Sequence, residues 1–351
     1  MIKKPACLLL LIFLSFFGFA QSMSLEEALT SLGRNVEFRW DPFFASGTFS
    51  TGGHEASFVS GRAGEAGAVL FGRREVLNLP LPFLENGNIR FPETFISQVR
   101  STLNRFAEHD SARFRIGTIV IDPGHGGVDS GTAWNYTVNG RTLRIMEKDI
   151  VLRISRMLHA SLSAAFPGRR VLLTREGDYN LSLEQRTNVA NSQSLASNEI
   201  AIFISVHANS SLSNRNARGF EVWYLDPSHR RDLVDRSRYT EFEEVIPIIN
   251  TMLEEEITTE SIILANYILR RMDEAVGDVS PNRGLKAHNW FVVRNALMPS
   301  VLVELGFVSN REEALLLNDE AYLKKLSDAL YKGISDFIVF FERSGGVAAL
   351  Q

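Results

Sequence analysis

The sequence predicts an α/β protein: a mostly parallel sheet of about six strands with helices on both faces, preceded by a small β-rich domain. Two observations support this fold class. Between about residues 115 and 343, short apolar segments alternate with longer amphipathic ones, which is typical of a parallel sheet with helical crossovers. Residues 21–110 are instead rich in glycine and aromatic residues, and their apolar runs are short. The chain of 351 residues is long enough for two domains.

Residues 1–20 have the pattern of a secretory signal peptide. Lys3 and Lys4 precede an apolar run over 5–20 that ends in small residues, as such a signal requires. The run is shorter than the roughly 20 residues of a membrane-spanning helix, so a cleaved signal is favoured over a membrane anchor. We expect cleavage after Ala20, export to the periplasm or cell envelope, and no stable membrane span in the mature chain.

The composition excludes several classes of protein. Hydrophobic residues make up 45% of the chain and charged residues 22%, which is an ordinary globular balance. The formal net charge is -4 and no basic block is present, so we expect no nucleic-acid partner. Cys7 is the only cysteine and lies within the signal. The mature chain therefore has no disulfide, and any metal must be held by histidine, aspartate or glutamate.

Residues 21–110 predict a separate β-rich domain. Helices are expected at 24–32 and 92–106, and the Asn86-Gly87 pair beside a strand-like run indicates a hairpin. In pattern alone, the region resembles the copper-amine-oxidase N-terminal-like module of some secreted bacterial proteins. That resemblance implies no copper. Such a module would serve to target the protein to the cell wall or septum.

The second domain, expected over 115–343, alternates strands and helices. The expected strands span residues 118–123, 169–175, 199–208, 219–225, 289–295 and 300–307. The expected helices span residues 147–166, 182–193, 260–276 and 319–343. In a sheet of this kind, functional groups gather at the carboxyl ends of the strands.

Four residues capable of metal or proton chemistry lie where strands end or a helix begins. His125 follows the strand at 118–123 within the glycine-rich stretch IVIDPGHGGVDSG. We expect His207 at the end of the third strand and Glu304 at the end of the last strand, and Glu147 opens the first long helix. Because these positions meet at one edge of a parallel sheet, we expect two histidines and two glutamates to lie together.

This set of residues suits zinc-assisted hydrolysis. A catalytic zinc takes three protein ligands, often two histidines and one glutamate, and leaves one position for water. The metal lowers the pKa of that water to about 7 and polarises the substrate carbonyl. A further carboxylate is then needed as general base and later as acid for the leaving nitrogen. Zn²⁺ is therefore the expected cofactor.

Each of these residues also has a purely structural interpretation. His125 would be a polar residue leaving the core, although the surrounding glycines favour the close approach of a ligand. Glu147 alone would be a helix-start carboxylate favoured by the helix dipole. Glu304 lies among apolar residues, where an unpaired carboxylate is costly, so a role is favoured. The other histidines are expected to be structural: His54, His109, His159, His229 and His288.

Five ordered motifs resemble the zinc-dependent N-acetylmuramoyl-L-alanine amidases of the cell-separation type (type 3 amidases). They are VIDPGHGGVDSG, MEKDIVL, LLTREGDYNLSLEQRTNVAN, FISVHANS and PSVLVELGFVSN, and the similarity covers about residues 115–343. The resemblance implies a phosphorylase/hydrolase-like catalytic domain. It implies His125, Glu147 and His207 as zinc ligands and Glu304 as the catalytic glutamate. It also implies cleavage of the amide that joins N-acetylmuramic acid to L-alanine of the peptidoglycan stem peptide.

Further residues of these motifs are expected to be structural or have no assigned role. Arg175 and Arg186 lie in the third motif. We expect Arg186 to pair with an acidic residue and to shape the loop. Asn209 and Ser210 stand where many relatives have an acidic residue, so neither is assigned a role.

An insert over 226–259 separates one strand from the next helix. From 241 to 260 it contains seven acidic residues and neither Lys nor Arg. Apolar residues at helical spacing predict a short amphipathic helix, with Pro247 tolerated in its first turn. The helix is either an ordinary surface helix or an autoinhibitory lid. As in some family members, the lid would block the zinc site until an activator protein displaces it, with one glutamate in the open zinc position.

The leading hypothesis is an exported zinc amidase that cleaves peptidoglycan during wall remodelling or daughter-cell separation. A second hypothesis is a peptidoglycan-binding protein without catalysis, which the presence of all four site residues disfavours. A third is another zinc peptidase on the same scaffold. The product separates the three, because an amidase releases a stem peptide with a free N-terminal alanine.

Overall fold

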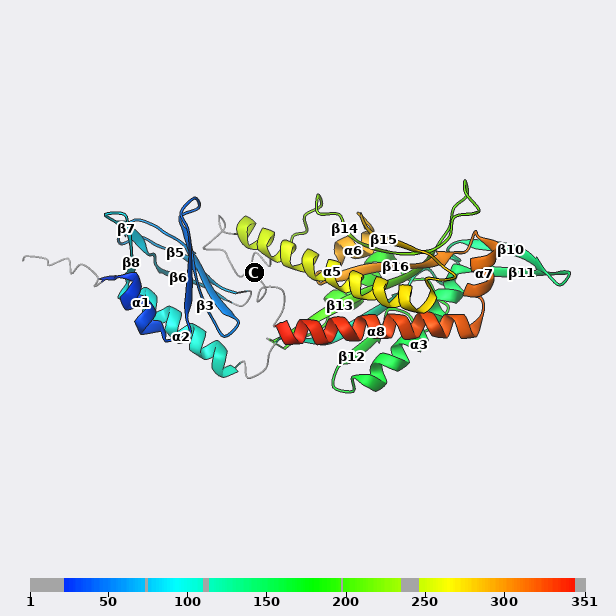
Figure 1. Cartoon of the computed structure of the whole chain (residues 1–351), viewed down its shortest axis with the longest axis horizontal. Helices are drawn as coiled ribbons and strands as arrows, with labels where there is room; N and C mark the ends of the chain where they lie inside the picture. The colour runs from blue at the N-terminus through cyan, green and yellow to red at the C-terminus, as the bar shows by residue number, and fades with distance from the viewer. Residues whose placement is uncertain (1–21, 73–74, 110–113, 197, 235–245, 345–351) are drawn as a thin grey trace, which may run out of the picture. The chain divides into compact units, whose positions relative to one another are not determined.

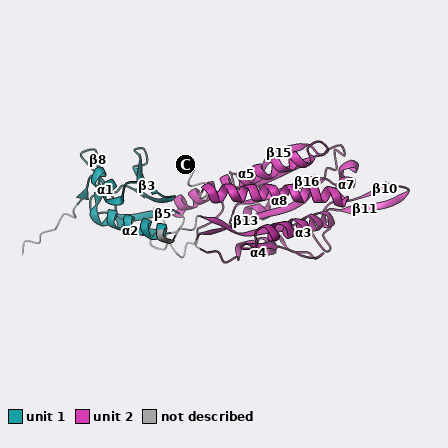
Figure 2. Ribbon diagram, turned by 60° about the horizontal axis from the view of Figure 1, so that its bottom comes forward, with its two compact units in different colours: residues 1–107 teal, residues 108–351 magenta. Residues whose placement is uncertain are grey.

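The computed structural model describes residues 22–72, 75–109, 114–196, 198–234 and 246–344. The chain divides into two compact units, Met1–Ala107 and Glu108–Gln351, each with its own hydrophobic core (Figure 2). The signal peptide expected at 1–20 lies outside the described residues and stays a prediction. Within the described part of the chain, no helix combines the length and apolarity needed to cross a membrane.

Unit 1 is built on a five-stranded antiparallel sheet with the order β2-β3-β4-β5-β6. Its strands are β2 (Glu37–Asp41), β3 (Ser46–Thr51), β4 (His54–Val59), β5 (Ala66–Phe71) and β6 (Glu75–Pro80). The other elements are β1 (Ser22–Met23), α1 (Leu25–Leu32), β7 (Phe83–Glu85), β8 (Asn88–Pro92) and α2 (Glu93–His109). Both expected helices and the expected β-rich character are confirmed.

Local sequence explains the ends of two elements in unit 1. Ser24 caps α1 in a capping box with Glu27, which satisfies free amides at the helix start. Asn86 and Gly87 have φ values of 51° and 78° and form the turn between β7 and β8. Positive φ at both central positions is the requirement of a tight hairpin turn, and the predicted hairpin is confirmed.

Unit 2 contains a six-stranded sheet with the order β12-β9-β13-β16-β14-β15. Its strands are β9 (Arg115–Pro123), β12 (Arg170–Leu173), β13 (Glu199–Asn209), β14 (Phe220–Leu225), β15 (Asn282–His288) and β16 (Ser300–Phe307). The first four strands in this order are mutually parallel, whereas β14 pairs antiparallel with β16 and parallel with β15. The starts of β14 and β15 therefore lie at the edge where β9, β13 and β16 end.

Helices cover both faces of this sheet, as predicted. They are α3 (Glu147–Ala165), α4 (Leu183–Asn191), α5 (Ile246–Val276), α6 (Phe291–Asn295), α7 (Arg311–Leu317) and α8 (Glu320–Ser344). Ile119 and Ile121 of β9 belong to the larger core, with residues of α3, α5 and α8. Val120 between them belongs to a second core with residues of α4 and α6. Figure 1 shows α5 and α8 side by side on the first of these faces.

One expected strand is wrong. Residues 289–295 form the N-terminal boundary and body of helix α6, and the edge strand is β15 instead. Val292 and Val293 of α6 are buried in the second core. A short apolar run satisfies a strand and a buried helical turn equally well, so periodicity alone could not separate them.

A two-stranded hairpin before α3 was not predicted. Its strands are β10 (Ala133–Val138) and β11 (Arg141–Met146), and they pair only with each other (Figure 1). The Asn139-Gly140 turn has φ values of 50° and 75°. This Asn-Gly pair, flanked by strand-like residues, was the signal that could have revealed the hairpin.

The insert contains a helix as predicted, but the expected short length is wrong. The helix is the first part of α5, a single helix of 31 residues that continues through the next expected helix. No residue between 248 and 276 is glycine or proline, so nothing in the sequence breaks the helix. Pro247 lies in the first turn, where it is tolerated.

Candidate metal centre

Three predicted ligands come together at the edge where β9 and β13 end. His125 follows β9, Glu147 is the first residue of α3, and His207 lies in β13. One ligand atom from each lies within 4.8 Å of the other two. Nε2 of His125 and Nδ1 of His207 lie 3.1 Å and 3.0 Å from Oε1 of Glu147. Two imidazoles and one carboxylate at such distances form a donor set that suits zinc.

The glycines around His125 leave room for the other ligands. A Cβ atom at Gly124 would lie 2.3 Å from Cε1 of His207. A Cβ atom at Gly131 would lie 2.5 Å from Oε2 of Glu147. His125 itself has a φ of 58°, a conformation that non-glycine residues rarely adopt and that concentrates at functional sites.

Asp129 orients the His125 ring. Its Oδ2 atom lies 2.9 Å from Nδ1 of His125, which leaves Nε2 on the side of Glu147. A carboxylate on the far nitrogen of a metal-binding histidine fixes the ring and its tautomer. Sequence analysis missed Asp129, although it lies four residues after His125 in the same glycine-rich motif.

The Glu147 carboxylate is held by the backbone as well as by the histidines. Its Oε1 accepts from the amide of Ala208 at 3.0 Å, and its Oε2 accepts from the amide of Thr132 at 2.9 Å. Burial opposes its ionisation, but hydrogen bonds with His125 and His207 hold the pKa of Glu147 far below its usual range. Glu147 is therefore a fixed anion.

The electrostatics of His125 follow from the same contacts. Burial disfavours the imidazolium, but the hydrogen bonds and charges of Glu147 and then Asp129 outweigh it, so the pKa of His125 is raised.

Glu304 lines the same pocket, and its pKa is shifted in the opposite direction to that of Glu147. It is register partner to His207 on β13 and to Glu221 on β14. Its Oε2 atom is buried and has no hydrogen-bond partner among the described residues. Burial raises the pKa of Glu304 well above its usual range, and the nearby carboxylates of Glu147 and Glu221 raise it further. A carboxyl group with a raised pKa is a stronger base than an ordinary glutamate and is suited to proton transfer.

The ligands and Glu304 line one pocket of about 600 Å³. Trp290, Phe291 and Leu183 add apolar walls, and Asn180 and Ser182 add polar ones. No described residue of the insert at 226–259 lines this pocket.

Two buried arginines hold the loop that carries His125. Arg186 donates to Oδ1 of Asp122 at 2.8 Å and to the carbonyl of His125 at 2.6 Å. The prediction that Arg186 pairs with an acidic residue and shapes the loop is confirmed. Arg175 is fully buried and donates to the carbonyls of Pro123 and Gly124 at 2.9 Å and 2.7 Å.

Asn209 and Ser210 have roles that the sequence did not indicate. Both line the metal pocket. Asn209 donates to Oε1 of Glu221 at 2.8 Å, and the Oγ of Ser210 accepts from the indole of Trp134 in β10 at 3.3 Å. Ser210 therefore links the hairpin to the pocket.

The remaining described histidines lie outside the ligand group. His159 contacts the carbonyl of Val171 at 3.1 Å, and His229 lies 3.3 Å from the hydroxyl of Ser228. His288 packs on Trp290 with ring centroids 4.6 Å apart. His54 lies in β4 of unit 1. The side chain of His109 lies outside the described residues.

Glu254, one of the glutamates of the insert, is engaged away from the metal site. Its carboxylate forms a buried ion pair with Arg231, with a shortest distance of 2.7 Å. Asn250 reinforces this contact by donating to the carbonyl of Arg231 at 2.6 Å. Residues 235–245, including three of the acidic residues, lie outside the described residues, so the expected lid stays a prediction.

Comparisons with known proteins identify similar chains. A family model described as N-acetylmuramoyl-L-alanine amidase matches residues 119–336. A probable N-acetylmuramoyl-L-alanine amidase, AmiB of Haemophilus influenzae, is 32% identical over 241 residues, covering 63% of this chain and 52% of that protein. The amidase AmiA of Escherichia coli is 27% identical over 243 residues, covering 64% of this chain and 77% of that protein.

A solved structure of an N-acetylmuramoyl-L-alanine amidase from Clostridium difficile 630 is 25% identical, with a TM-score of 0.48. The match covers 64% of this chain and 98% of the chain in the solved structure. The chain thus spans about half the length of the Haemophilus relative.

Proposed function

Because this chain belongs to the N-acetylmuramoyl-L-alanine amidase family, we propose that it is a zinc-dependent amidase acting on peptidoglycan. The scissile bond is the amide between N-acetylmuramic acid and L-alanine. The observation that carries the proposal is the group His125, Glu147 and His207 beside a buried Glu304 with an unpaired oxygen.

The residues present fit a zinc ion. The donors are two imidazoles, which bind zinc in their neutral form, and a carboxylate that stays ionised. The described part of the chain contains no cysteine that could supply a thiolate. Zinc at such a site supplies Lewis-acid activation of water and of the substrate carbonyl. Gly124 and Gly131 keep the centre free of side chains that would crowd the ligands.

Glu304 is the proton carrier in this proposal. Its raised pKa and unpaired Oε2 suit a group that takes a proton from the attacking water and returns it to the leaving nitrogen. Glu147 cannot serve in this way because its hydrogen bonds keep it ionised. The two glutamates therefore take different tasks in one pocket.

The cellular role we propose is wall remodelling or daughter-cell separation in the periplasm or cell envelope. It rests on the signal-peptide pattern at 1–20 and on the peptidoglycan substrate. An activator that displaces the insert over 226–259 is part of the same proposal. The two rival functions, a catalytically inactive wall-binding protein and another zinc peptidase, lack a specific observation in their favour.

The test measures zinc content and product together. Purified peptidoglycan is incubated with the mature protein, with Glu304→Gln and with Glu312→Gln, an exposed control on α7. We expect about one zinc per chain in all three proteins and new N-terminal alanine from the parent and the control only. A loss of roughly 10² to 10⁴ in rate is expected for Glu304→Gln. Zinc-free protein, or new termini other than alanine, would refute the proposal.

The insert is tested by replacing residues 235–245 with a glycine-serine linker of equal length. This keeps the Arg231–Glu254 ion pair and removes the acidic side chains of that segment. A rise in amidase activity supports a lid, and unchanged activity argues against it.

A further inference from the structure

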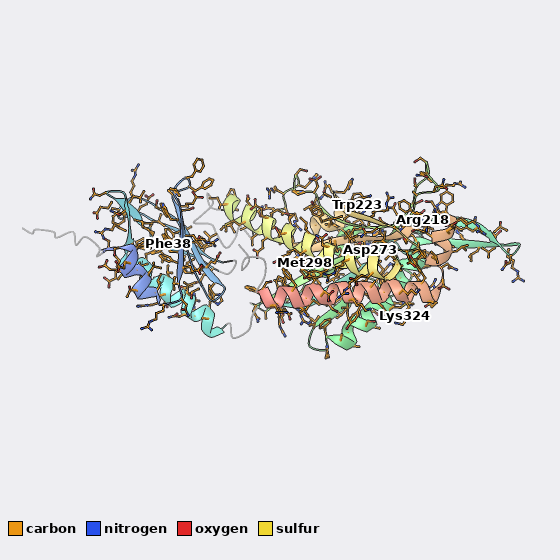
Figure 3. The ribbon with its side chains drawn as sticks, in the orientation of Figure 1. Phe38, Arg218, Trp223, Asp273, Met298 and Lys324 are labelled. Atoms are coloured by element: carbon orange, nitrogen blue, oxygen red, sulfur yellow. The ribbon has the colours of Figure 1, made fainter. Side chains whose placement is uncertain are left out.

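A second pocket of about 440 Å³ adjoins the metal pocket at Glu304 and is lined by none of the three ligands. The two pockets share Asn209, Ser210, Trp290 and Glu304. The second pocket also has Trp223, Phe307, Glu221 and Arg283 in its walls. Figure 3 labels Trp223, whose indole nitrogen is buried and has no partner among the described residues. The two pockets therefore meet at Glu304.

Two cations meet one carboxylate beside this second pocket, and of the two cations only Arg283 lines it. Glu221 is buried, and its Oε2 accepts from Nε of Arg283 at 2.7 Å and from Nζ of Lys286. Its Oε1 accepts from the uncharged amide of Asn209. The group formed by Glu221, Arg283 and Lys286 therefore carries one more positive charge than it carries negative charges.

A bulge in β15 puts both cations beside Glu221. Phe220 pairs with Asn282 and Val222 pairs with Leu285, so the pairing with β14 contains one extra residue in β15. Arg283 and Lys286 are three residues apart, and on a regular strand their side chains would point to opposite faces of the sheet. The extra residue between them puts both side chains on the same face. Gly284, with a φ of 83°, lies within the extra step.

The far end of the Arg283 guanidinium is available to a ligand. Its Nε is bound to Glu221, its plane lies over Phe307 at 4.9 Å, and its Nη1 is 3.4 Å from the carbonyl of Arg218. Nη2 has no hydrogen-bond partner among the described residues, and the side chain is 35% exposed. A held arginine with a free edge is suited to binding a carboxylate.

We propose that this second pocket binds a carboxylate of the substrate's stem peptide, with Arg283 as the residue that selects it. The inference rests on the proposed amidase function. Glu304 borders both pockets and returns a proton to the leaving nitrogen, which belongs to the peptide. The side of Glu304 away from the metal ligands is therefore the peptide side. Peptide residues carry carboxylates, whereas the glycan beside the scissile bond offers hydroxyl and acetamide groups.

The test compares two soluble muramoyl peptides that differ in one group. One has a free carboxylate on the second residue of the stem, and the other has a primary amide there. We expect kcat/KM of the parent enzyme to be about tenfold higher for the carboxylate, the size of one charge-assisted hydrogen bond at a partly exposed site. Arg283→Gln should remove the preference, Arg283→Lys should keep part of it, and Arg270→Gln on α5 should leave it unchanged.

A binding measurement separates this inference from the proposed function. Affinities of both peptides are measured by calorimetry for Glu304→Gln and for Glu304→Gln with Arg283→Gln, with thermal unfolding as a check on the fold. A carboxylate preference that disappears with Arg283 supports the inference even if neither peptide is cleaved. Equal affinity for both peptides and equal cleavage of both would overturn the carboxylate-binding inference. Cleavage of the peptides would still support the proposed amidase function.

Discussion

At the residue scale, the pKa values of two glutamates in one pocket are shifted in opposite directions. Glu147 gains four hydrogen-bond partners, the two histidines and the amides of Thr132 and Ala208. Glu304 is buried with an unpaired oxygen and faces two other carboxylates. Residue type alone does not distinguish a ligand from a proton carrier, whereas these surroundings do.

Protons and zinc compete for His125, so the stabilisation by zinc should depend on pH. Because the pKa of His125 is raised in the fold, its protonation stabilises the metal-free protein at low pH, and this contribution is lost as the pH rises through that pKa. Zinc needs the unprotonated ring. We expect the rise in Tm caused by zinc to be larger at about pH 8 than at about pH 5.5.

The measurement is differential scanning calorimetry with and without excess zinc. His207→Ala removes one ligand and should abolish most of the zinc-induced rise at both pH values. His159→Gln, which lies outside the ligand group, is the control. A zinc effect that is the same at both pH values would contradict the competition.

The pair Asp122–Arg186 should be a major contributor to stability, because both side chains are buried. Arg186→Met leaves Asp122 as a buried charge, for which a cost of about 3–5 kcal/mol in the free energy of unfolding is expected. Urea denaturation measures it. Lys324→Met on α8, an exposed residue labelled in Figure 3, should change stability by less than about 0.5 kcal/mol. The hydroxyls of Thr174 and Ser205 also donate to Asp122. A small effect of Arg186→Met would show that these two hydrogen bonds suffice to hold Asp122.

At the element scale, the insert is joined to the sheet by α5. Arg231 pairs with Glu254 of α5 and also donates to the carbonyl of Ala296 at the end of α6. Because α6 follows Trp290 and carries Phe291, which both line the metal pocket, this ion pair connects the insert to the wall of the pocket.

Replacing one partner of this ion pair should lower the free energy of unfolding more than replacing both partners. Glu254→Leu leaves Arg231 buried and unpaired, and we expect a loss of about 3–5 kcal/mol in the free energy of unfolding. Arg231→Met combined with Glu254→Leu should recover most of it, since neither buried charge remains. A double-mutant cycle by chemical denaturation checks this, and additive losses would contradict it.

At the scale of the whole molecule, the two compact units have separate cores. The core of unit 1 draws its buried residues from between 28 and 106, and the cores of unit 2 begin at 116. All four candidate site residues belong to unit 2. A unit with its own core and a complete site is expected to fold and act alone.

A chain starting at Glu108 should therefore fold cooperatively, bind about one zinc and cleave soluble muramoyl peptides at a rate similar to that of the full chain. Calorimetry, metal analysis and product assay check the three properties. The same fragment with His207→Ala is the control and should fold without binding zinc tightly. An unfolded fragment would show that unit 2 needs unit 1.

Much of the architecture and the whole set of four candidate residues followed from the sequence. Local patterns were sufficient because each residue lies in or beside a strongly patterned element: His125 after β9, His207 in β13, Glu304 in β16, and Glu147 opening α3. The glycine-rich turn around His125 could also be predicted from the sequence, because the backbone conformations that glycine permits are a local property.

The tertiary structure alone decided what surrounds those residues. Because β14 and β15 run opposite to the other strands, Glu221, Arg283 and Lys286 lie at the edge where β9, β13 and β16 end. Packing and crossovers set the direction of a strand, and local periodicity does not show it. The same applies to α6, whose apolar run was compatible with a strand, and to α5, which joins two expected helices. A lone glutamate in the sequence shows neither its partners nor its burial, so only the folded chain distinguishes Glu147 from Glu304 and opens the second pocket beside them.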